Sequence, residues 1–294
     1  MQTDRLAKAY RADSGKHFRL KDFNPADTAH LHSKEHAEAA LQQGILRMAE
    51  LQDKLYAQDR WAVLLIFQAM DAAGKDGVIK HVMSGVNPQG CQVYSFKTPS
   101  DLELQHDFLW RTTRCLPERG HIGIFNRAYY EEVLIARVHP EVLDNEKIPA
   151  PHLGKNIWEE RFEDIRSFER HMARNGTVIR KFFLHVSKKE QKKRFLARLE
   201  EPEKNWKFSA SDIQERKYWD DYQSAYEDMI RNTAAEHAPW YVVPADNKWF
   251  TRLVVSAVVV DTLESLDLAY PTVSAEKRKE LEAAKKILLG KTSS

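Results

Sequence analysis

An apolar run at residues 61–67, which ends shortly before a loop containing Gly74 and Lys75, constrains the fold of this chain more than any other feature. Seven apolar residues in a row predict a strand that is buried on both faces, as in a parallel sheet. Apolar residues at helical spacing follow the loop, at Val78, Ile79, Val82 and Met83. A buried strand, a short loop with glycine and lysine, and a helix in this order are the setting that a phosphate-binding loop requires.

Similar apolar runs of strand length recur along the chain, at residues 92–96, 121–125, 178–186 and 240–243. Helices are expected at residues 33–56, 155–174, 188–201, 209–233, 247–268 and 274–289. Ser33 is the expected N-cap of the first helix, because a serine hydroxyl accepts hydrogen bonds from unpaired N–H groups there. The alternation of strands and helices predicts an α/β fold, a doubly wound parallel sheet of about five strands flanked by helices.

We expect three parts in the chain. Residues 1–57 form an N-terminal arm and helix, in which the polar stretch 1–33 lies over the surface or, alternatively, is a partly disordered tail. Residues 58–270 form the α/β core that contains the loop with Gly74 and Lys75, with a helical lid at residues 188–220, where proline and asparagine interrupt two very polar helices. Residues 271–294 form a C-terminal amphipathic helix and tail, suited to a surface or an oligomer contact.

The charge and the cysteine content exclude several classes of protein. The 45 basic and 43 acidic residues nearly cancel, so the bulk charge does not mark a nucleic-acid or membrane-surface protein. Cys91 and Cys115 are too few for a disulfide framework or a four-ligand zinc site. No apolar run approaches the roughly 18 residues of a membrane span, and the N-terminus lacks a signal-peptide apolar region. We therefore expect a cytoplasmic protein with no nucleic-acid or membrane partner.

The phosphate loop departs from the usual pattern GxxxxGK[ST] at two positions. Ala69 stands where the first glycine is usual, and Asp76 replaces the hydroxyl residue that normally binds magnesium. Backbone N–H groups of the loop would bind phosphate oxygens, and Lys75 would neutralise charge during transfer. The expected phosphate-binding positions around the lysine are Ala72, Ala73, Gly74, Asp76 and Gly77.

Asp71 lies within the loop, where its carboxylate would face the bound phosphates. Like charges at about 4 Å repel by roughly 4 kcal/mol at an effective dielectric near 20. Asp71 is therefore interpreted as a metal ligand, with a divalent ion between it and the phosphates. Asp76 has an alternative role, because an acidic residue in the first turn of a helix complements the helix dipole without any ligand.

Asn126 and Arg127 follow the third predicted strand and reach the carboxyl edge of the sheet, where open α/β sheets bind ligands. Arg127 would hold phosphate oxygens through two N–H groups, and Asn126 would bind a phosphate or a metal-bound water. Aspartate is usual where Asn126 stands. Metal binding is therefore expected to move to Asp71 and to Glu132, with Glu131 as the alternative glutamate and a solvated helix face as the alternative for at least one of them.

A run of basic residues marks the helix expected at 188–201. Arg194 and Arg198 are four residues apart on one face, so both would reach a transferring phosphate. A solvated charged face is the alternative, and it is the usual role of such a run. Lys204 and Lys207 would extend a positive channel for a long polyanion.

Lys97 and Arg111 are candidates for the acceptor side of the cleft, where a nucleotide would bind. Arg111 follows Leu109 and Trp110 on a helical stretch, so a structural ion pair is its alternative role.

Two ordered motifs carry a resemblance to a known family. They are Asp-Ala-Ala-Gly-Lys-Asp-Gly at residues 71–77 and Phe-Asn-Arg-Ala-Tyr-Tyr-Glu-Glu at residues 125–132. Further matching stretches are residues 97–100, 108–111, 202–208 and 238–246. Together these segments resemble the polyphosphate kinase 2 family over most of residues 35–268.

The resemblance implies a P-loop kinase core with a lid that moves phosphoryl groups between inorganic polyphosphate and nucleoside mono- or diphosphates. It implies magnesium, with manganese as an alternative ion. By the same resemblance, Asp71 and Lys75 form the catalytic pair of the first loop, and Asn126 and Arg127 that of the second strand. Asn126 and the long N-terminal extension resemble the branch that accepts AMP as well as ADP. GMP and GDP stay open as acceptors, and we expect a homo-oligomer, a dimer or a tetramer.

Two other functions remain open at this stage. An ATP-dependent nucleoside or nucleotide kinase shares the P-loop and the lid, and it would use ATP as its preferred donor. A polyphosphate-binding protein without catalysis would explain Ala69, Asp76 and Asn126, although Lys75 and Arg127 are retained.

Overall fold

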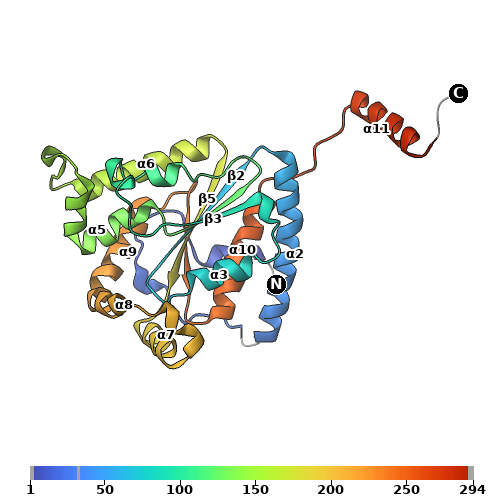
Figure 1. Ribbon diagram of the computed structural model, residues 1–294. Coiled ribbons are helices and arrows are strands. Elements are labelled where there is room, and N and C mark those ends of the chain that lie inside the picture. Colours follow the sequence, from blue (N-terminus) through green and yellow to red (C-terminus); the bar gives the residue numbers. More distant parts are fainter. Residues whose placement is uncertain (1–2, 32–33, 291–294) are drawn as a thin grey trace.

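The computed structural model describes residues 3–31 and 34–290. The N-cap predicted at Ser33 lies outside these residues. Figure 1 shows a central sheet between two layers of helices, and a C-terminal helix that projects away from the body.

Five parallel strands form the sheet, as the sequence predicts. They are β2 (Ala62–Ala69), β3 (Cys91–Ser95), β4 (Ile122–Asn126), β5 (Thr177–His185) and β6 (Trp240–Pro244). A sixth strand, β1 (Arg11–Ala12), pairs antiparallel with β6, and the order across the sheet is β1-β6-β5-β2-β4-β3. The predicted doubly wound α/β fold is therefore confirmed.

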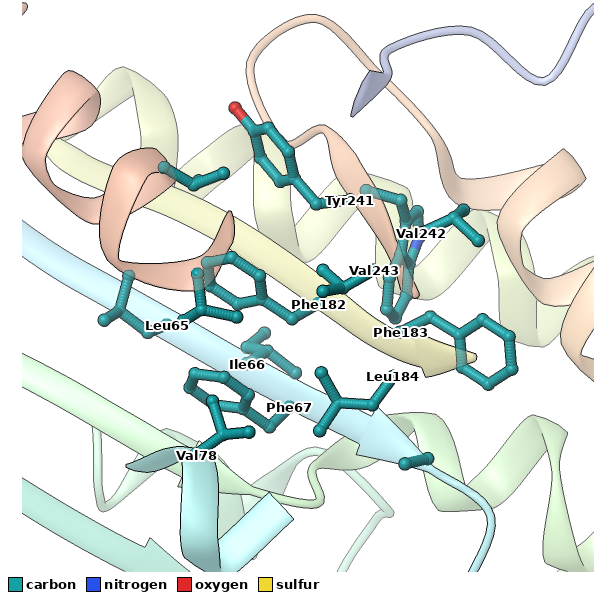
Figure 2. Packing of buried hydrophobic residues seen from close by; sticks show 14 of the residues in the cluster. Leu65, Ile66, Phe67, Val78, Phe182, Phe183, Leu184, Tyr241, Val242 and Val243 are labelled. Atoms are coloured by element: carbon teal, nitrogen blue, oxygen red, sulfur yellow. The ribbon is translucent and has the colours of Figure 1, made fainter. Parts of the chain in front are cut away.

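β2 lies at the centre of this order, and all eight of its residues are buried. The rings of Phe67 and Phe182 stack at 4.8 Å between neighbouring strands, and Figure 2 shows them among the buried side chains of β5 and β6. The continuous apolar run at residues 61–67 is explained by the position of β2 inside a sheet that helices cover on both faces.

Helices cover both faces of the sheet (Figure 1). One layer contains α2 (Lys34–Gln58), α3 (Lys75–Val82) and α10 (Lys248–Glu264). The other contains α5 (Ile135–Val138), α6 (Ile157–Arg174) and α9 (Trp219–Thr233). The segment expected as one helix at 209–233 is divided into α8 (Ala210–Glu215), a 3-10 turn and α9. With α7 (Lys188–Glu200), α8 lies at the lower end of the molecule in Figure 1.

The N-terminal arm contributes to the core rather than only lying over it. It contains α1 (Thr3–Ala9) and β1, and it buries Leu6, Tyr10, Phe18 and Leu20. The ring of Tyr10 meets that of Phe250 edge to face at 5.9 Å. A two-residue strand is too short to produce an alternating pattern, which is why the sequence indicates only an irregular segment here.

Two short helical elements complete the description. α4 (Trp110–Thr113) precedes β4, and α11 (Ala275–Leu288) is the projecting C-terminal helix, which has no buried residue. Within the described residues, no helix combines the length and the apolar character that crossing a membrane requires.

Candidate active site

The loop after β2 has the strained backbone of a phosphate-binding turn. Ala72 and Gly74 have φ angles of 61° and 108°, in the left-handed region that side chains disfavour. α3 begins at Lys75, so its first N–H groups face the loop. Ala69 is still part of β2, and a residue in extended conformation does not need to be glycine. The missing first glycine is therefore explained by a strand that continues to position 69.

Lys75 lies at the centre of this turn. Its Nζ donates to the carbonyl oxygen of Ala69 at 3.1 Å. Burial and the charge of Arg127 lower the pKa of Lys75, against the opposing attraction of Asp71 and the acidic residues nearby. The side chain is thus partly buried and is held at the base of the loop.

The end of β4 brings two polar side chains against the loop, because β2 and β4 are paired with Phe67 opposite Asn126. An N–H group of Arg127 donates to Asp71 Oδ1 at 3.1 Å, and Asn126 Nδ2 donates to Asp76 Oδ1 at 2.7 Å. Arg127 has a φ of 68°, a second strained residue at the site. The structure therefore brings together the two residue pairs that the sequence singled out.

Arg194 has different partners from those expected for a phosphate clamp. Its side chain is buried and donates to the carbonyl oxygens of Ala72 at 3.1 Å and Ala73 at 2.6 Å. It also donates to the carbonyl oxygens of Ala245 at 2.6 Å and Asp246 at 3.1 Å. Its Nε donates to Glu190 at 2.9 Å. All five N–H groups are engaged, so Arg194 joins the loop to the end of β6, and phosphate binding by Arg194 stays a prediction.

The remaining basic residues line a cleft of about 950 Å³ above the loop. Nine basic and three acidic side chains border it, whereas the whole chain has a net charge of only +2. Arg198, Lys204 and Lys207 are among them, and an N–H group of Arg198 contacts Asp212 Oδ2 at 3.0 Å. A cleft with this charge concentrates polyanions.

Lys248 and Arg252 also line the cleft, although the sequence did not single them out. They lie one turn apart near the start of α10. The available signal was their i and i+4 spacing in a predicted helix. Only the packing of α10 beside α3 brings that helix to the loop.

Glu132 lies apart from Asp71, unlike the expected metal pair, and metal binding by Glu132 stays a prediction. Its carboxylate accepts from Arg161 Nε at 2.9 Å and lines a neighbouring pocket instead of the loop cleft. Glu131 faces the site: its Oε2 lies 3.7 Å from an N–H nitrogen of Arg127. Residues 129–133 form a 3-10 helix, in which adjacent side chains diverge by about 120°. This turn separates the two glutamates.

Burial raises the pKa of Glu131, while the charges of Arg127 and Lys75 act in the opposite direction. Among the described residues, no three acidic, histidine or cysteine side chains gather closely enough to hold a metal by themselves. The donors at the loop thus suit an ion that takes one or two carboxylates and completes its shell with water and phosphate oxygens, as magnesium does.

A second pocket of about 260 Å³ adjoins the cleft and shares Phe96, Lys97, Thr98 and Arg127 with it. Arg111 lines this pocket, but an N–H group of it donates to the carbonyl oxygen of Lys97 at 2.8 Å, and its guanidinium lies 5.3 Å from the centre of the Phe96 ring. Arg111 therefore also stabilises the loop at residue 97. Apolar side chains cover much of the pocket: Phe96, Pro99, Leu104, Phe108, Ile135, Ala136 and Val142.

A strand-loop-helix phosphate site at the carboxyl edge of a parallel sheet, under a strongly basic cleft, defines a P-loop kinase-like phosphotransferase. The family model for polyphosphate kinase 2 matches residues 31–270. The chain therefore belongs to the polyphosphate kinase 2 family, as the two motifs predicted.

Three relatives illustrate the match. An ADP-polyphosphate phosphotransferase of Rhodopseudomonas palustris is 57% identical over 96% of this chain and 98% of its own length. An AMP/ADP-polyphosphate phosphotransferase of Meiothermus ruber is 45% identical over 90% of this chain and 95% of its own length. The crystal structure of polyphosphate kinase 2 from Arthrobacter aurescens TC1 has a TM-score of 0.86 and 40% identity, over 98% of this chain and 97% of that one.

Proposed function

We propose that this chain transfers phosphoryl groups between inorganic polyphosphate and AMP or ADP. The observation that carries the proposal is the basic cleft directly above the phosphate loop, which suits a long polyanion better than a single triphosphate. Relatives with those substrates in their names cover almost the whole chain and support the same conclusion.

In this proposal the loop N–H groups and Lys75 bind the phosphoryl group that moves. Arg127 holds the same group from the side of β4, and the positive charges stabilise the negative charge on its equatorial oxygens during in-line transfer. Asp71 would hold a divalent ion, with magnesium as the proposed metal, and that ion would neutralise the phosphates. Arg198, Lys204 and Lys207 would contact the rest of the polyphosphate chain and exclude water when α7 and α8 close.

The nucleotide is proposed to bind in the adjoining pocket, with its phosphates toward Arg127 and Lys97. The shared border of the two cavities makes this the short path from an apolar pocket to the phosphate loop. Stacking and apolar contact with Phe96 and Phe108 would hold the base.

The test is an initial-rate comparison of AMP, ADP, GMP and GDP, each with long-chain polyphosphate and magnesium. Formation of the next higher nucleotide is expected from AMP or ADP, and Lys75→Ala should abolish it. Lys80→Ala, an exposed lysine of the same helix, is the matched control and should leave the rate unchanged. No product from any nucleotide, or a preference for ATP as donor, would reject the proposal. Light scattering on the same samples tests the expected dimer or tetramer.

A further inference from the structure

Two carboxyl groups lie in the adjoining pocket beyond the residues that it shares with the phosphate cleft. Glu132 belongs to the 3-10 helix Tyr129–Val133, and Glu146 is the last residue of the 3-10 helix Pro140–Glu146. Both line the pocket, and their side chains are only 8% and 16% exposed. Carboxyl groups this deep in a mostly apolar pocket require partners.

Arg161 is one such partner, and it contacts both carboxyl groups. Its Nε donates to Glu132 at 2.9 Å, its NH2 group lies 3.8 Å from Glu146, and its guanidinium lies over the ring of Phe108 at 4.6 Å. Arg161 is not among the residues that line the pocket. The guanidinium of Arg161 therefore contacts the carboxyl groups from outside the pocket. A ligand inside the pocket would contact the oxygens of Glu132 and Glu146 and not Arg161.

The two carboxyl groups also lie near each other. Burial and the proximity of Glu132 raise the pKa of Glu146 to about 8, while the charge of Arg161 acts in the opposite direction. Glu132 accepts from Arg161 through one oxygen, and a carboxylate has further acceptor positions. Its oxygens are therefore hydrogen-bond acceptors for a ligand.

Three other charged groups of the pocket have partners of their own. Glu103 accepts from the N–H and the hydroxyl of Ser100 at 2.7 and 2.9 Å. Asp107 accepts from the N–H of Leu109 at 3.0 Å, and Arg111 is bound to Lys97. The Glu132–Glu146 pair is thus the feature of the pocket best placed to discriminate between bases.

We infer that Glu132 and Glu146 make this site selective for adenine nucleotides. The exocyclic amino group of the base, on the side away from the phosphates, is the group that they would recognise. The amino group of adenine would donate to these oxygens. Hypoxanthine presents a carbonyl oxygen at the same position, so two acceptors would face each other without a proton. The inference rests on the proposed function, since it assigns a role within the proposed nucleotide pocket.

The experiment compares kcat/KM for AMP and IMP with polyphosphate as donor, in the wild type and in Glu146→Gln. The carboxyl group of Glu146 carries at most one proton, whereas a glutamine amide carries two N–H groups, so the variant has a further donor for the carbonyl of hypoxanthine. The wild type should prefer AMP by roughly tenfold to a hundredfold, which is what one hydrogen bond to a charged group provides. In Glu146→Gln the ratio should fall to within about threefold of unity. Glu141→Gln, an exposed glutamate of the same 3-10 helix, is the control and should keep the wild-type ratio.

A loss of structure would lower both rates together, so the ratio separates selectivity from stability. The increase in melting temperature with each nucleotide gives a second readout that does not need turnover. Equal wild-type rates for AMP and IMP, or an unchanged ratio in Glu146→Gln, would overturn the inference while leaving the proposed function intact. Absence of turnover with every nucleotide would overturn both.

Discussion

Arg127 and Asp71 contact each other across the carboxyl edge of the sheet, with 3.1 Å between an N–H nitrogen and Oδ1. They are 56 residues apart in sequence, and the pairing of β2 with β4 brings them together. Both side chains are about one-third exposed, so a phosphate entering the cleft can reach them. We expect the phosphate to replace Asp71 as the partner of Arg127, which frees the carboxylate for a divalent ion.

Asp71→Asn should lower turnover by at least a factor of about 100, because loss of one preorganised charged group at a transfer site has this effect. The free energy of unfolding should change by less than about 1 kcal/mol, since the ion pair is partly exposed. Initial rates and urea denaturation measure the two quantities. Asp101→Asn, an exposed aspartate outside both pockets, serves as the control. A rate within twofold of the wild type would contradict the role of Asp71.

Arg194→Lys should reduce both activity and stability. A lysine retains the charge but loses the planar set of five N–H groups that binds four carbonyl oxygens and Glu190. We expect a loss of roughly 2–3 kcal/mol in the free energy of unfolding, because buried carbonyl oxygens lose their partners. The KM for polyphosphate should rise as the loop loses its fixed shape.

Arg198→Lys is the comparison for that experiment. Arg198 lies one turn further along α7, and its contact with Asp212 is partly exposed. Its replacement should cost less than about 1 kcal/mol in stability. If both variants lower stability equally, or if Arg194→Lys does not, Arg194 does not hold the loop.

The strands and helices were predictable because each long element has its own apolar period. Residues 61–67 and 178–186 appear as buried runs, and both are central strands. The proximity of Asp71 and Lys75 to Asn126 and Arg127 was also predictable, because the parallel strands that precede them end at the same edge of the sheet.

Contacts that depend on tertiary packing could not be predicted in this way. The spacing of Arg194 and Arg198 indicates one shared face, but it does not show that backbone carbonyl oxygens already surround Arg194. Adjacent side chains point in different directions in any helix, so the sequence could not show which of Glu131 and Glu132 faces the loop; the orientation of the turn at residues 129–133 decides it. Lys248 and Arg252 belong to α10, and only its position beside α3 brings them to the cleft.

A buried ion pair behind the site permits a stability test. Lys181 Nζ contacts Glu169 Oε2 at 2.6 Å, and both side chains are almost completely buried. Glu169 also accepts from the hydroxyl groups of Tyr129 and Tyr130, which precede Glu131. Lys181→Met and Glu169→Gln should each lower the free energy of unfolding by roughly 3–5 kcal/mol, because each leaves a buried charge without its opposite charge.

The double variant should lose less free energy of unfolding than the two single variants lose together. A double-mutant cycle by urea denaturation measures the difference, and a coupling of at least about 1 kcal/mol is expected. Additive losses would show that the two side chains act independently.

His185 gives the chain a predictable dependence on pH. It lies at the end of β5, and burial lowers the pKa of its imidazole to about 4, although Asp246 acts in the opposite direction. In the unfolded chain the pKa is the ordinary value of about 6.5. Between these values the unfolded chain binds the proton and the folded chain does not. The contribution of His185 to the free energy of unfolding is therefore complete above about pH 6.5 and is lost as the pH falls to about 4.

The loss in the free energy of unfolding should approach about 3 kcal/mol, the equivalent of the pKa difference. His185→Gln removes the titration, so its stability should fall less steeply than that of the wild type between pH 6.5 and 4. Carboxylates that titrate below pH 5 affect both proteins equally and cancel in the difference. His17→Asn, which changes an exposed histidine in a left-handed conformation that asparagine tolerates, should keep the wild-type slope. Parallel profiles for the wild type and His185→Gln would show that the imidazole of His185 accepts its proton in the folded chain as readily as in water.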